Sequence, residues 1–65
     1  MKIVELILKL DLEITIEIIE LTLHGENVLF IGKIKELDFV DFYKWRNSDY
    51  CNTKIEDNIL TIYTI

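Results

Sequence analysis

The sequence predicts an α+β domain: a small antiparallel sheet of about four strands with one or two short helices, in the order α-β-β-α-β-β. Two patterns support this prediction. Apolar and polar residues alternate in two regions, which is typical of half-buried strands, and apolar residues recur at helical spacing in two others. The chain has 65 residues, enough for one domain spanning 1–65.

Residues 1–9 fit a short helix, because Ile3, Leu6 and Ile7 share one helical face. The alternation that follows also extends back into this segment, so a strand is the alternative. A strand continuing to Ile18 would far exceed the usual length of about 5–6 residues. A short N-terminal helix is therefore the prediction.

Residues 10–18 alternate strictly and predict the first strand. Its apolar row is Leu10, Leu12, Ile14, Ile16 and Ile18. The alternation then changes parity, because Ile19 and Leu21 continue the apolar row. A β-bulge near Ile18-Ile19 would return these residues to the first face. A short turn between two strands is the alternative.

Two turns predict two hairpins. Residues 24–27, His-Gly-Glu-Asn, join the first strand to a returning strand at 28–34, in which Gly32 marks a bulge or a strand end. Asp57-Asn58 joins a strand at 54–56 to one at 59–65. Between the hairpins, residues 36–46 predict a helix with Leu37, Val40 and Tyr43 on one side.

Composition limits the possible functions. The single cysteine, Cys51, excludes a disulfide within the chain, and one histidine without a Cys/His cluster predicts no metal site. The net charge of -5 disfavours direct nucleic-acid binding and permits a basic protein partner. No apolar run is long enough to span a membrane, so a cytoplasmic protein is expected. With 51% hydrophobic residues in so short a chain, self-association as a homodimer or higher oligomer is also expected.

Catalytic chemistry finds little support. His24 lies in a predicted turn, and no sequence pattern places Ser48, the one serine, beside it. Nucleophilic catalysis needs a nucleophile, a base and an orienting group. We therefore predict a protein that is not an enzyme and needs no cofactor, and assign Cys51 no function.

Two candidate surfaces remain. An acidic strand face carries Asp11, Glu13 and Glu17 at a spacing close to that of nucleic-acid phosphates. An ordinary solvated face is favoured over phosphate mimicry, because charge runs usually only solvate. The second candidate is an interface formed by the aromatic residues of the second helix, namely Phe39, Phe42, Tyr43 and Trp45. Phe42 and Trp45 lie opposite Val40 and Tyr43, so either the C-terminal chain or a partner buries them.

The chain resembles short phage and prophage proteins of low-GC bacteria, including anti-defence inhibitors of the anti-CRISPR or anti-Hachiman type. The segments that carry the resemblance are residues 14–27, 28–37 and 55–63. The resemblance implies a small protein of the host cytoplasm that binds a bacterial defence protein, often as a homodimer. It supplies no residue-level motif.

Three functions follow as hypotheses. The leading one is a stoichiometric inhibitor that binds a host defence protein. The second is a structural or regulatory phage accessory protein that forms a homo-oligomer. The third is a sponge for a signalling nucleotide, which ranks last because it needs converging basic residues and the chain has only seven lysines and arginines, scattered along it.

Overall fold

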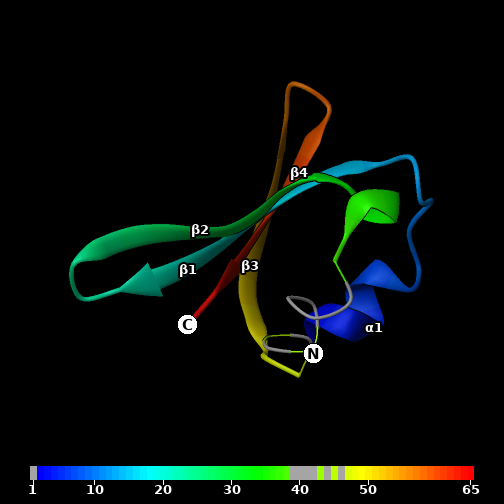
Figure 1. The fold of residues 1–65 in the computed structure, drawn as a ribbon. Helices are drawn as coiled ribbons and strands as arrows, with labels where there is room; N and C mark the ends of the chain where they lie inside the picture. Colours follow the sequence, from blue (N-terminus) through cyan, green and yellow to red (C-terminus); the bar gives the residue numbers. More distant parts are fainter. Residues whose placement is uncertain (1, 39–42, 44, 46) are drawn as a thin grey trace.

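The computed structural model describes residues 2–38, 43, 45 and 47–65. Four strands form one sheet in the order β2-β1-β4-β3, with helical segments on one side (Figure 1). The elements along the chain are α1 (Ile3–Ile7), β1 (Thr15–Thr22), β2 (Gly25–Lys33), the 3-10 turn η1 (Ile34–Glu36), β3 (Tyr50–Glu56) and β4 (Ile59–Thr64). The protein therefore has an α+β-like, mostly β architecture, as predicted at that level.

The sheet is mixed, and the prediction of an antiparallel sheet is wrong. Each hairpin is antiparallel, but the central strands β1 and β4 run parallel, with Ile16 opposite Leu60 and Ile18 opposite Ile62. The segment between the hairpins carries the chain from one edge of the sheet to the other, which parallel pairing requires. This arrangement places the two strands with apolar rows at the centre and the polar strand β3 at an edge.

The N-terminal helix is confirmed as α1. Ile3 and Ile7 are buried, and Leu6 and Leu10 pack against the same core. Two backbone hydrogen bonds fix the start of the helix: the Lys2 N–H donates to the Glu5 carboxylate at 3.1 Å, and the Ile3 N–H donates to the Ser48 carbonyl at 2.9 Å. The helix is thereby attached to the chain just before β3.

The first strand begins later than predicted, at Thr15. Before it, the Asp11 carboxylate accepts a hydrogen bond from the Glu13 N–H at 2.9 Å, a local contact that competes with strand pairing. The carbonyls of Leu12 and Ile14 accept hydrogen bonds from the backbone at η1. Residues 10–14 thus form a turn-containing segment, and the predicted placement of Leu12 in the buried row is wrong, because this side chain is exposed.

The structure confirms an irregularity at Ile18-Ile19, but the extra residue belongs to β2 and not to β1 as predicted. The pairing of β1 with β2 shifts there, since Ile18 lies opposite Phe30 and Ile19 opposite Val28. Leu29 of β2 is consequently the extra residue. The pairing of β1 with β4 continues through the same point without a shift, so Ile18 and Ile19 lie on opposite faces of the sheet.

The later leucines therefore do not return to the face of Ile18, as the sequence predicted. Leu21 shares the face of Ile19, and Leu23 lies exposed in the loop. The loop is Leu23-His24 rather than residues 24–27. It is shortened because the Thr22 hydroxyl donates to the Gly25 carbonyl at 2.8 Å and accepts from the His24 N–H at 3.2 Å.

The other predicted turn is confirmed. Asp57 and Asn58 both have positive φ, 52° and 63°, as a tight two-residue hairpin turn requires. Gly32 lies one residue before the end of β2, which agrees with its predicted role at a strand end. A Cβ at this position would lie 3.2 Å from the Phe30 ring, and the φ of 153° further favours glycine.

Most of the predicted second helix falls outside the described residues, including Phe39, Val40 and Phe42. Tyr43 and Trp45 have helical backbone conformation. The predicted start at residue 36 is wrong. The Glu36 carboxylate accepts a hydrogen bond from the Lys33 N–H at 2.9 Å and so caps the start of η1, and the backbone at Leu37 is extended.

The core lies on one face of the sheet, between β1, β4 and the helical segments. It consists of Ile3, Ile7, Ile16, Ile18, Ile34, Trp45 and Ile62. We call the face that carries Ile16, Ile18 and Ile62 the covered face, and the opposite face the open face. Every buried residue of α1 and η1 belongs to this one cluster, whereas Ile19 does not. In the described part of the chain, no helix is long and apolar enough to span a membrane.

Candidate interaction surface

The predicted acidic row is not formed. Asp11 and Glu13 precede β1, and only Glu17 lies on a strand. Glu13 accepts hydrogen bonds from Lys35 Nζ at 2.9 Å and from Lys33 Nζ at 3.3 Å. Because the three carboxylates do not share a strand face, the spacing that suggested phosphate mimicry is lost.

Glu13 provides a direct test of this arrangement. The hydrogen bond from Lys35, followed by that from Lys33, lowers the pKa of the Glu13 carboxyl below its ordinary value. A lowered folded-state pKa gives stability that is present above the unfolded pKa and is lost as pH falls through the folded pKa. The contribution is small because the pair is exposed.

We expect an NMR titration to place the pKa of Glu13 below the ordinary value of a glutamate, and we expect Lys35→Ala to raise it. Lys54→Ala is the control, because Lys54 pairs with Glu56 instead. An unchanged Glu13 pKa in Lys35→Ala would contradict the pairing.

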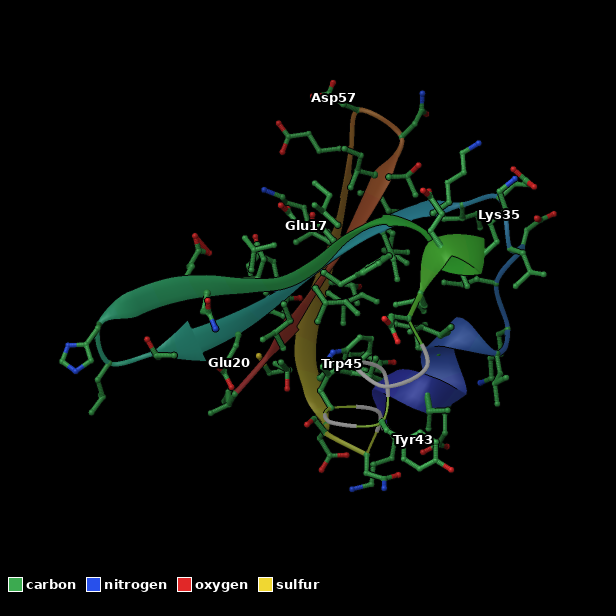
Figure 2. The ribbon with its side chains drawn as sticks, in the orientation of Figure 1. Glu17, Glu20, Lys35, Tyr43, Trp45 and Asp57 are labelled. Carbon is green, nitrogen blue, oxygen red and sulfur yellow. The ribbon has the colours of Figure 1, made fainter. Side chains whose placement is uncertain are left out.

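The aromatic candidates separate into core and surface. Trp45 is 7% exposed and belongs to the core, so the chain itself buries this side chain, which was the alternative to burial by a partner. Tyr43, predicted among the interface aromatics and on the same helix side as Leu37, is 55% exposed. In Figure 2, Trp45 lies beside β3 on the side of α1, and Tyr43 lies at the outer margin. Phe39 and Phe42 lie outside the described residues, so their role in an interface stays a prediction.

The helical wheel placed Trp45 on the outer side of the helix, and it failed because the backbone at Leu37 is extended. The helical wheel assumed one helix from residue 36, and this phase placed Trp45 on the outside. Leu37 itself packs against the core.

The structure instead displays an apolar surface on the open face, at the side of β1 and β2. Cross-strand partners lie on the same face of a sheet, so the register brings its members together. We call it the open-face patch, and it consists of Ile19, Leu21, Val28, Ile31 and Tyr63. Val28 is 52% exposed and Ile31 is 57% exposed, whereas Ile19, which lies opposite Val28 on the central strand, is buried.

Acidic side chains border the open-face patch. Glu17 lies opposite Ile31 and Glu26 lies opposite Leu21 in the pairing of β1 with β2. On the far side of the same face, Lys54 Nζ and Glu56 Oε2 are 3.2 Å apart. The hydrogen bond with Glu56 is the main cause that raises the pKa of Lys54. Lys33, which follows Ile31 on the same face of β2, is likewise paired with Glu13. Both lysines beside the patch therefore have carboxylate partners.

Sequence reasoning missed this patch because it assigned Ile19 and Leu21 to the covered face. The available signal was the adjacent pair Ile18-Ile19, since neighbours in a regular strand point to opposite faces. Two apolar neighbours in a central strand indicate burial on both sides.

A second feature lies at the other end of the sheet. A wide hollow of about 460 Å³ opens between the segment before β1 and the turn after β3. Its lining is mostly apolar, and its residues are Leu10, Glu13, Ile14, Thr15, Ile55, Asn58 and Leu60. Ile55 is 78% exposed at its rim. The open-face patch and this hollow are thus two separate apolar features of the sheet.

The candidates for chemistry are not assembled into a site. His24 lies in the loop of the first hairpin, and the Ser48 carbonyl bonds to the start of α1. Cys51 is exposed, and its thiol lies 3.5 Å from the Tyr63 carbonyl. Within residues 2–38, 43, 45 and 47–65, no group of three or more His, Cys, Asp or Glu could hold a metal ion.

Comparison of the chain with family models, with curated proteins and with solved structures found no match.

Proposed function

We propose that the protein is a non-catalytic binding protein that attaches to another protein through the open-face patch. The observation that carries this proposal is the pair Val28 and Ile31, which are each more than half exposed on the same sheet face as the buried Ile19. A contiguous apolar surface with a polar border is characteristic of protein interfaces. Apolar contacts supply affinity in such a surface, and the border supplies orientation.

The charges favour a particular kind of partner. Glu17 and Glu26 border the patch, and the whole chain carries a net charge of -5. A matching surface is therefore an apolar ridge flanked by lysine or arginine. Opposite charges at the border would speed association and align the two proteins.

The more specific proposal is that the partner is a bacterial defence protein that is inhibited by stoichiometric binding. It rests on the resemblance to short anti-defence proteins of phages and prophages. An exposed patch suits this role, because an inhibitor needs only to occupy a surface that the target uses. The nucleotide sponge is disfavoured, because Lys33 and Lys35 pair with Glu13 and Lys54 pairs with Glu56.

The proposal is tested by capture from a lysate of a low-GC bacterium. Tagged wild-type protein is compared with Val28→Lys/Ile31→Lys, which places two charges in the patch, and with Leu12→Lys, which changes an exposed leucine before β1. We expect the amount of captured defence protein to fall at least tenfold with the double variant, since burying an unpaired charge costs several kcal/mol. With Leu12→Lys the amount should stay at the wild-type level. Circular dichroism checks that each variant is folded.

Equal capture by the wild-type and double-variant proteins would remove the patch as the binding surface. Capture of a protein unrelated to defence would support a binding function but would contradict the proposal that the chain inhibits a defence protein. A strain protected by the captured defence system supplies the functional measurement, since expression of the wild-type chain should abolish protection and the double variant should not.

A further inference from the structure

The two edges of the sheet differ in their ability to accept another strand. The β2 edge is interrupted in the middle by the extra residue Leu29, and such bulges are a common device against edge pairing. In β3 the irregularity lies at Cys51, near its start, and residues 52–56 pair regularly with β4. The β3 edge therefore offers the longer regular template.

The turn after β3 determines which backbone groups face outward. Asp57 and Asn58 form a two-residue turn, so the flanking Glu56 and Ile59 make the hydrogen-bonded pair that closes it. Hydrogen-bonded and non-hydrogen-bonded pairs alternate along an antiparallel ladder. The N–H and C=O groups of Ile55 and Thr53 consequently point away from β4, and at Thr53 the N–H donates to the Asn52 side chain at 2.9 Å.

The side chains on this edge are complementary to their own copy. Lys54 and Glu56 lie on the open face, on either side of Ile55 along the strand. In an antiparallel pair centred on Ile55, Lys54 of each copy faces Glu56 of the other. Four charges of alternating sign then form a ring, whereas a lysine on an edge strand disfavours most other strands.

On the covered face, the pairing of two β3 strands at Ile55 also forms an apolar contact. Ile55 is 78% exposed and lies at the rim of the hollow that Leu10, Ile14 and Leu60 also line. Pairing at Ile55 places the two Ile55 side chains against each other and brings the two hollows together. An exposed isoleucine and an open apolar hollow are thereby both removed from water.

We infer that two copies of this chain join antiparallel along β3, about a two-fold axis at Ile55, to form a continuous eight-stranded sheet. The backbone of Ile55 exchanges two hydrogen bonds with its copy, and the four charges of Lys54 and Glu56 select this register. The inference concerns a surface separate from the open-face patch, so the two proposals can fail independently.

Cysteine cross-linking tests the register. In a Cys51→Ser background, Ile55→Cys would place two sulfur-bearing residues about 5.5 Å apart between Cα atoms, within the range that a disulfide spans. The matched variant is Thr53→Cys, which is on the same edge and two residues away. After oxidation at micromolar concentration, we expect at least fivefold more disulfide-linked dimer from Ile55→Cys than from Thr53→Cys on a non-reducing gel.

Charge exchange tests the ring. Lys54→Glu or Glu56→Lys alone places like charges opposite each other. We expect analytical ultracentrifugation to show a dimer dissociation constant roughly tenfold higher, because exposed ion pairs contribute only modestly. Lys54→Glu combined with Glu56→Lys restores alternating signs and should restore the wild-type dissociation constant. Preferential cross-linking of Thr53→Cys would overturn the Ile55 axis. A monomer at all concentrations, or a double variant that remains weak, would overturn pairing along β3.

Discussion

Replacing Trp45 by alanine is expected to lower the free energy of unfolding by about 3–5 kcal/mol, the usual cost of removing a buried aromatic side chain. Trp45 is 7% exposed and is grouped in the core with Ile3, Ile18 and Ile62. A 65-residue domain is only marginally stable. Most of the variant should therefore be unfolded at 25 °C.

Urea denaturation followed by circular dichroism measures this effect at several protein concentrations. A core role predicts the same loss at each concentration, whereas an interface role predicts a loss that depends on concentration. Leu8→Ala is the control, because this side chain is 79% exposed and should change stability by about 0.5 kcal/mol or less. A Trp45→Ala variant with the wild-type midpoint but weaker association would return Trp45 to an interface.

The second large effect distinguishes two adjacent isoleucines. Ile18→Ala is expected to cost about 4 kcal/mol, because Ile18 lies in the enclosed core and its loss leaves a cavity. Ile19→Ala is expected to cost about 2 kcal/mol, the transfer contribution alone, because water can fill the space on the open face. Both residues are buried in the monomer, so burial alone would predict similar losses.

Paired urea titrations of the two variants measure this difference. If Ile18 and Ile19 were on one face, as the sequence suggested, the two losses would be alike. A larger loss at Ile19 than at Ile18 would contradict the assignment of faces. Ile19→Val is the conservative control, since it removes one methyl group and should cost about 1 kcal/mol.

Local features were predictable because neighbouring residues determine them. The spacing of Ile3, Leu6 and Ile7 predicted α1, and Asp57-Asn58 predicted a turn that both residues make with positive φ. The position of the irregularity at Ile18-Ile19 was also predictable, since two adjacent apolar residues break the alternation.

Features that depend on distant residues were not predictable. Parallel pairing of β1 with β4 joins the two hairpins, and no local pattern specifies which strands become neighbours. The acidic row is not formed because the Asp11 carboxylate bonds to the backbone of Glu13, while Lys33 at the end of β2 and Lys35 in η1 pair with Glu13. Trp45 was misplaced because the wheel began at residue 36, where the 3-10 turn and the extended Leu37 intervene.

The position of β4 has a consequence for the order of folding. β1 and β2 are adjacent in the chain, but β1 obtains its other neighbour only from the strand that follows all the rest. During synthesis, the first hairpin must therefore leave the ribosome with one side of β1 unpaired, and the central pair forms only after β4 emerges. Such long-range pairing slows folding and prolongs exposure of apolar strands to aggregation. The interval between the synthesis of β1 and the emergence of β4 should thus influence how much native protein accumulates.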